Sequence, residues 1–154
     1  MPATRTRKPP EPMPKLPREF SGPMVQIFVP GHPPSVNKLF FKGRGARQMG
    51  GKRPEYVSWE MAVYRALLLS PYSLGELKSL KNRPYRFTLE LISESWMNKC
   101  GTVRKPDTPN LVKAAEDAVC KVTGWADSAN VEQRAVKVEV PGAVDGTRIR
   151  FEFA

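Results

Sequence analysis

The sequence from Arg104 to Val131 reads R-K-P-D-T-P-N-L-V-K-A-A-E-D-A-V-C-K-V-T-G-W-A-D-S-A-N-V, and it predicts the central helix of the fold. Its apolar residues recur every three or four positions, which places one face of a helix in the core; they are Leu111, Ala115, Ala118, Val119 and Val122. Thr108 is a good N-cap, and Pro109 falls at the first helical position, where its missing N–H costs nothing. Gly124 predicts the end of the helix. A basic lead-in therefore precedes this helix, and a turn into a strand follows it.

Outside this stretch, alternating apolar and polar residues predict strands. The alternating segments are 25–29, 87–91, 136–140 and 149–153. A second helix is predicted from a cap at Ser58 to about Leu69, where Pro71 stops it. We expect the last two strands to form a hairpin with a longer loop. These elements predict an α+β fold, with a mixed four- to five-stranded sheet and two main helices packed on it.

Length and charge indicate the organisation of the chain and the class of its partner. The 154 residues predict one folded domain, which we expect over residues 23–154. Residues 1–22 are rich in proline and cations, so they predict a disordered basic tail or, alternatively, an arm that lies along phosphates. Lys and Arg outnumber Asp and Glu by 25 to 15, a net charge of +10, which favours nucleic acid over membrane as the partner. No apolar run approaches the roughly 18 residues of a membrane span, and we expect no signal peptide.

The cysteines and the single histidine exclude common structural sites. Cys100 and Cys120 match neither a disulfide framework nor a zinc-binding pattern, so we expect reduced thiols in the cytoplasm. His32 is the only histidine of the chain, which excludes a histidine-based zinc set. It follows a predicted strand among prolines and is expected in a loop.

The segment from Asn37 to Arg53 contains no acidic residue. Its cations alternate with glycines and are Lys38, Lys42, Arg44, Arg47, Lys52 and Arg53. We expect a mobile basic loop that wraps duplex arms, because phosphate contacts need cations on adaptable backbone. The alternative is an ordinary flexible surface loop, with Phe40 and Phe41 in the core. A phenylalanine that wedges into an opened base step is a further interpretation.

The central stretch also resembles a known family. It combines P-D-x-x-N-L-x-K, A-x-x-D-A-V and W-x-D-x-A-x-V in that order, as in the RusA-type Holliday junction resolvases, and P-P-S-V-N-K at Pro33–Lys38 is similar to the loop after that family's first strand. The resemblance covers roughly residues 24–153. It implies a small, dimeric, magnesium-dependent endonuclease, bacterial or phage-encoded and cytoplasmic. Such an enzyme acts on four-way junctions or other branched DNA in recombination and repair.

The resemblance also implies roles for particular residues. Asp107 and Asp127 are the expected metal ligands, and Glu132 is a spare acid that can serve as a third. They would hold Mg²⁺, or Mn²⁺ in its place, which activates water for phosphodiester hydrolysis. Lys113 would face the scissile phosphate and join the two aspartates as a catalytic residue. Asn110 matches the family pattern, and with Arg104 and Lys105 it completes the set expected to contact DNA.

Two positions depart from the family pattern. Pro109 and Ser128 stand where the family carries acids. A second function is therefore a catalytically impaired RusA-like protein that binds branched DNA without cleaving it, and a third is a basic protein that binds RNA. Taken from the residues alone, Lys113 has the alternative role of an i, i+4 partner for Asp117.

Trp125 and the assembly complete the expectations. Trp125 follows an amphipathic helix and is expected to close the core, with base stacking as the alternative. A four-way junction has two-fold symmetry, and symmetric cutting requires two sites related by the same axis. We therefore expect a homodimer.

Overall fold

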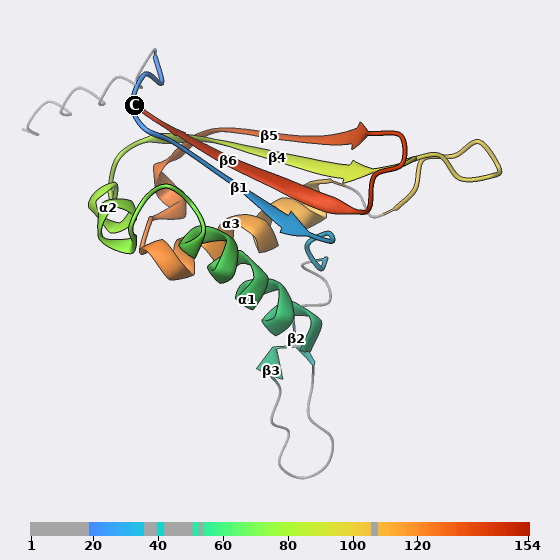
Figure 1. Ribbon diagram of the computed structural model, residues 1–154, viewed down its shortest axis with the longest axis horizontal. Coiled ribbons are helices and arrows are strands. Elements are labelled where there is room, and N and C mark those ends of the chain that lie inside the picture. Colours follow the sequence, from blue (N-terminus) through green and yellow to red (C-terminus); the bar gives the residue numbers. More distant parts are fainter. Residues whose placement is uncertain (1–18, 36–39, 42–50, 53, 106–107) are drawn as a thin grey trace, which may run out of the picture.

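The computed structural model describes residues 19–35, 40–41, 51–52, 54–105 and 108–154. The helices are α1 (Pro54–Leu68), α2 (Leu74–Ser79) and α3 (Pro109–Thr123), and a short 3-10 helix spans Asp127–Ala129. The strands are β1 (Met24–Pro30), β2 (Phe40–Phe41), β3 (Gly51–Lys52), β4 (Tyr85–Ser93), β5 (Asn130–Glu139) and β6 (Gly146–Phe153). Four of them form a mixed sheet in the order β1-β6-β4-β5, and the helices lie on one side of it (Figure 1). The predicted α+β architecture is confirmed.

The core lies between this sheet and the helices. Alternate side chains of three strands point into it, as the period of two requires; they are Val25, Ile27 and Val29, then Phe87, Leu89 and Leu91, then Ile149, Phe151 and Phe153. β6 pairs antiparallel with both β1 and β4, so it occupies the interior of the sheet. From the helix side, α1 contributes Trp59, Val63 and Leu67. Each such side chain contributes about 1.5–3 kcal/mol of hydrophobic free energy.

The connection from β4 to β5 runs through α3. β4 and β5 are parallel, and parallel neighbours require a long crossover, which α3 provides. The predicted hairpin of the last two strands is therefore wrong, because β4 lies between β5 and β6. Residues 140–145 connect β5 to β6 past the end of β4. There the Val140 N–H donates to Ser93 O at 2.9 Å.

The start of α1 differs from the prediction. The helix begins at Pro54, and the predicted cap, Ser58, lies inside it. Proline presets the helical φ at the first position, and Glu55 places a negative charge at the positive end of the helix dipole. The end at Leu68 agrees with the prediction. In the segment expected to be a loop, β2 and β3 pair antiparallel.

α3 begins and ends where the sequence predicts, but its first cap is different. Pro109 is at the start, yet Thr108 has helical backbone angles, with φ −56° and ψ −41°, and its side chain makes no capping hydrogen bond. A capping side chain needs an extended residue to reach back to the first turn, so the predicted cap is wrong. Gly124 ends the helix in the left-handed region at φ 76°, and its N–H donates to Cys120 O at 2.8 Å.

Trp125 closes the end of the core next to α3. Its indole N–H donates to Leu77 O at 2.6 Å, and its ring packs edge-on against Phe151 and Phe153, with centroids 5.0 and 4.9 Å away. The core interpretation of Trp125 is confirmed. No helix in the described part of the chain is long and apolar enough to cross a membrane.

Candidate functional site

Lys113 and Asp127 meet on the surface beside α3. After Gly124 the chain folds back along the helix, and the 3-10 helix brings Asp127 next to the second turn of α3. The Lys113 Nζ donates to Asp127 Oδ2 at 2.8 Å and lies 2.9 Å from Asp117 Oδ1. The i, i+4 pair with Asp117 that the residues alone suggest is therefore present, and Lys113 has a second partner in Asp127. Its role opposite a phosphate stays a prediction.

The charges of this cluster reinforce each other. The hydrogen bond from Lys113 holds the pKa of the Asp127 carboxyl below its ordinary value, and Coulomb attraction to the same ammonium adds to the effect. Hydrogen bonds to Asp127 and then Asp117 raise the pKa of Lys113 in turn. At neutral pH the aspartate is therefore ionised, which is the form that binds a cation, while the lysine competes for the same oxygen.

A pocket of about 300 Å³ opens beside Asp127. Its lining combines α3 with the start of β5 and consists of Glu116, Asp127, Asn130, Val131, Glu132 and Gln133. Most of the polar groups of this lining carry oxygen atoms, which are the donors that Mg²⁺ prefers. The pocket thus has suitable chemistry for a hard cation or for a group that binds through one.

Glu116 forms the buried side of the pocket, and the sequence analysis missed it. It is only 4 % exposed, and its Oε1 accepts hydrogen bonds from Tyr85 Oη at 2.6 Å and from Asn130 Nδ2 at 3.0 Å. One signal was available in the sequence. Glu116 lies between Val112 and Val119 at helical spacing, so it is an acid on the apolar face of an amphipathic helix.

The side chain of Asn130 is oriented by its neighbours. Its Nδ2 donates to Glu116 Oε1 and, at 3.4 Å, to Gln133 Oε1. These two hydrogen bonds fix the orientation of the amide group. Its oxygen, Oδ1, is buried and has no hydrogen-bond partner among the described residues. A buried amide oxygen without a donor is costly unless a ligand satisfies it.

The donor set fits magnesium in part. Among the residues that the structure describes, no three Asp, Glu, His or Cys side chains converge as metal ligands. Mg²⁺ retains several waters and is often held by one or two carboxylates, so Asp127 and the Asn130 oxygen are compatible with it. Glu132 lines the same pocket, but its carboxylate also lies 3.6 Å from the Arg86 guanidinium. Asp107 lies outside the described residues.

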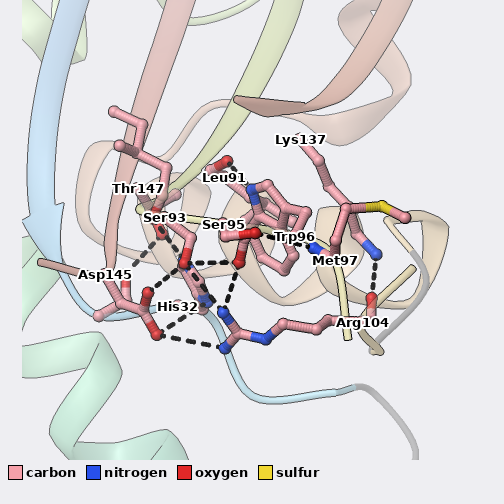
Figure 2. A network of polar contacts seen from close by, with 12 residues as sticks. His32, Leu91, Ser93, Ser95, Trp96, Met97, Arg104, Lys137, Asp145 and Thr147 are labelled. Carbon is pink, nitrogen blue, oxygen red and sulfur yellow. Dashed lines mark hydrogen bonds and ion pairs between the residues drawn. The ribbon is translucent and has the colours of Figure 1, made fainter. Parts of the chain in front are cut away.

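The residues predicted to contact DNA differ in their structural surroundings. Arg104 is held in a polar network, where its Nη1 donates to Ser95 O at 2.7 Å and to Ser93 Oγ at 3.1 Å (Figure 2). Lys105, the next residue, is exposed. The side chains of Asn110 and Lys52 are outside the description, as are Lys38, Lys42, Arg44, Arg47 and Arg53 entirely.

The network around Arg104 joins the lead-in of α3 to the sheet (Figure 2). The His32 ring stacks on Trp96 with centroids 5.0 Å apart, and its Nε2 lies 2.9 Å from Ile92 O. Asp145 accepts a hydrogen bond from Ser93 Oγ at 2.7 Å and lies 3.9 Å from the Arg104 guanidinium. His32 is in a loop as predicted, and the contacts anchor the chain that leads to Asp107.

A search of protein-family models finds no match for this sequence, and a search of curated proteins finds none either. The site must therefore be interpreted from its own chemistry. Within the described residues, Lys113 and Asp127 are in direct contact and Glu132 lines the adjoining pocket, whereas Arg104 belongs to the separate network beyond β4. A lysine beside an ionised carboxylate and further oxygen atoms can bind a phosphate through the ammonium and a cation through the oxygens.

Proposed function

We propose that the protein is a magnesium-dependent endodeoxyribonuclease of the RusA type that resolves Holliday junctions or other branched DNA. The contact of Lys113 with Asp127 at 2.8 Å, on the rim of the oxygen-lined pocket, is the observation that supports this most directly. These two residues come from separate motifs of the resemblance. The net charge of +10 supports a polyanionic partner.

Each residue has a distinct part in this proposal. Asp127 and the Asn130 Oδ1 would hold Mg²⁺ or Mn²⁺, together with Asp107 from the lead-in and Glu132 as an additional acid. When bound, the cation supplies activation of water and stabilises the leaving oxygen. Lys113 would exchange its contact with Asp127 for a phosphate oxygen and stabilise the negative charge that develops there.

Cleavage of a labelled four-way junction with Mg²⁺ tests the proposal. The wild-type protein should cut, and Asp127→Asn and Asp107→Asn should each abolish cutting while DNA binding is kept or slightly strengthened, because an unfilled carboxylate repels phosphate. Asp117→Asn is the matched control: it contacts the same lysine but does not line the pocket, so it should still cut. Normal cleavage by Asp127→Asn and Asp107→Asn would contradict the site.

The same ion pair favours a second candidate function. Lys113 occupies an oxygen of Asp127, and Pro109 and Ser128 replace family acids, as expected for a protein that binds branched DNA without cleaving it. Here the wild type should bind junctions yet fail to cut with Mg²⁺ or Mn²⁺. The double variant Pro109→Asp with Ser128→Asp should then gain cation affinity and activity together. Calorimetric titration with Mg²⁺ and a gel-based cleavage assay measure these two gains.

A further inference from the structure

The sheet has an outer face, turned away from α1, α2 and α3, and no helix of the described residues covers it (Figure 1). Side chains alternate between the two faces, and the strand register places the outward ones of β4, β5 and β6 in rows across the sheet. Read from β6 through β4 to β5, three successive rows are Glu152, Arg86 and Glu132; Arg150, Thr88 and Arg134; and Arg148, Glu90 and Val136. We call the second the arginine row, and it alone of the three contains no acid.

The rows on either side of it pair their arginines with carboxylates. Arg86 Nε donates to Glu152 Oε2 at 2.9 Å, and its Nη1 lies 3.6 Å from Glu132 Oε2. In the third row, Arg148 Nη1 donates to Glu90 Oε2 at 2.6 Å. The three rows together hold four arginines and three glutamates, so one positive charge of this surface has no matching acid.

The unmatched charge belongs to the arginine row. Arg134 makes no hydrogen bond or ion pair with any other residue that the structure describes. Arg150 approaches Glu90 only to 3.6 Å, which is longer than a hydrogen bond, and its Nε is buried without an acceptor in the described part of the chain. A buried N–H without an acceptor is destabilising unless a ligand accepts its hydrogen bond.

A pocket of about 300 Å³ lies over the arginine row. Arg134, Thr88 and Arg150 all line it. Neighbouring strands are about 4.8 Å apart, so the Cα atoms of the two arginines lie roughly 10 Å apart on either side of Thr88. Both guanidinium groups can therefore reach one ligand above Thr88, whose hydroxyl can donate a further hydrogen bond.

We propose that the arginine row binds a phosphate group, carried by a small phosphate monoester or present as inorganic phosphate. A guanidinium presents a planar fork of donors that fits two oxygens of a phosphate. Two such forks and a hydroxyl match an anion with several oxygens and close to two negative charges. A carboxylate, with two oxygens and one charge, would engage only one of the two arginines.

The adjoining rows favour a small ligand over a nucleic-acid strand. Residues two apart on a strand are separated by about 6.7 Å, so Glu132 and Glu152 lie on one side of the bound phosphate and Glu90 lies on the other. A nucleic-acid strand that follows β4 would place its next phosphates beside these carboxylates. Across the sheet, the partner of Arg150 on β1 is Gln26, which offers no cation to a second phosphate.

An NMR titration of the ¹⁵N-labelled full chain with inorganic phosphate tests the site, with sodium chloride adjusted to keep the ionic strength constant. The Arg150 Nε–H and the amides around Thr88 should shift and saturate with a Kd of about 1 mM, the range of a ligand held by a few charge-assisted hydrogen bonds. A parallel titration with glycerol 3-phosphate distinguishes the two sources. Tighter binding of this monoester assigns the site to phosphate esters, and equal or weaker binding assigns it to inorganic phosphate.

Three variants connect the shifts to the arginine row. Arg134→Gln should weaken phosphate binding by about tenfold or more, because it removes the guanidinium that has no acid beside it. Thr88→Glu places a carboxylate between the two arginines and should abolish binding. Arg65→Gln, at an exposed position of α1 on the helix side, removes the same charge as Arg134→Gln and should bind like the wild type. Circular dichroism checks that each variant keeps the fold.

Wild-type spectra without saturable shifts up to roughly 20 mM phosphate would overturn the proposal, as would Arg134→Gln that binds like the wild type. A short single-stranded DNA that displaces phosphate from the same resonances and binds more tightly would assign the surface to nucleic acid and would also overturn it. The inference does not depend on nuclease activity, which a junction-cleavage assay measures separately, so either proposal can fail without the other.

Discussion

Glu116 is the only buried acid among the described residues, and two donors share one of its oxygens. Burial and then the hydrogen bond to Glu116 raise the pKa of Tyr85 far above its ordinary value, so its hydroxyl is a permanent donor. Asn130 depends on the same oxygen for its orientation. Glu116 therefore sets the direction in which the Asn130 Oδ1 is presented, and it links the packing of β4 to the proposed cation site.

Replacement of Glu116 should show how strongly this cluster stabilises the fold. Glu116→Ala leaves Tyr85 Oη and Asn130 Nδ2 without their acceptor and should lower the free energy of unfolding by roughly 3 kcal/mol. Glu116→Gln keeps an oxygen for Tyr85 and should cost less, about 1–2 kcal/mol. Urea unfolding measures both. Asp117→Asn, at a half-buried position of the same helix, is the control and should stay within about 0.5 kcal/mol of wild type. Equal stability of Glu116→Ala and the control would refute this role.

At the residue scale the sequence predicted only part of the site. Lys113 and Asp127 were predicted through the motif resemblance, and the structure places them in contact. Glu116 was missed because its partners Tyr85 and Asn130 are 31 and 14 residues away, and sequence spacing does not reveal which side chains meet across elements. The polar network of Arg104 was missed for the same reason, since one acceptor, Ser93, ends β4 and the other, Ser95, lies in the loop that follows.

At the scale of elements, α3 depends on its left-handed C-terminal residue. A Cβ at Gly124 would meet no atom within 4 Å, so the cost of Gly124→Ala comes from the backbone at φ 76° alone. We expect a loss of about 1 kcal/mol in the free energy of unfolding. Gly75→Ala in the first turn of α2 is the matched control, because its Cβ would approach only Ser73 Oγ at 3.8 Å.

The control should stabilise by about 0.5 kcal/mol, since alanine lowers the entropy of the unfolded chain. Thermal unfolding of the two variants side by side measures the difference. If Gly124→Ala were as stable as Gly75→Ala, α3 would have to end by another route, with residue 124 outside the left-handed region.

Elements with strong periodicity were predicted well, and pairings between them were not. β1, β4, β6 and α3 follow the predicted patterns, because burial of one face imposes the period that the sequence shows. The hairpin prediction failed because the crossover through α3 makes β4 the neighbour of β5. β6 then pairs on the other side of β4 and not with β5. The error at Ser58 was local: serine offers a capping hydroxyl, but Pro54 already supplies a helix start.

At the scale of the whole molecule, the excess of cations should govern DNA affinity. If about six phosphates are contacted, the logarithm of the association constant should fall against the logarithm of salt concentration with a slope near −5. Arg44→Ala combined with Arg47→Ala should flatten that slope by up to about two units. Fluorescence anisotropy with a labelled junction, over a series of salt concentrations, provides the measurement.

The control for this experiment is Arg148→Ala. Arg148 Nη1 donates to Glu90 Oε2 at 2.6 Å, so this guanidinium is already engaged within the protein, and the slope should not change. An unchanged slope in the Arg44 and Arg47 variant would exclude the loop from the phosphate contacts. RNA in place of the junction tests the third function, and equal affinity for both would favour it.

β6 is the last strand along the chain, yet it lies between β1 and β4 in the sheet. Among the described strands β1 pairs with β6 alone, and the ladder joins Met24 to Glu152 and Pro30 to Gly146. On a ribosome that adds 5–20 residues per second, β1 emerges roughly ten seconds before its partner exists. During that interval the backbone of β1, including Val25, Ile27 and Val29, has no partner strand for its hydrogen bonds. We therefore expect misfolding and aggregation of this protein to be most frequent during its synthesis, when chaperones and the rate of translation determine how much of it reaches the folded state.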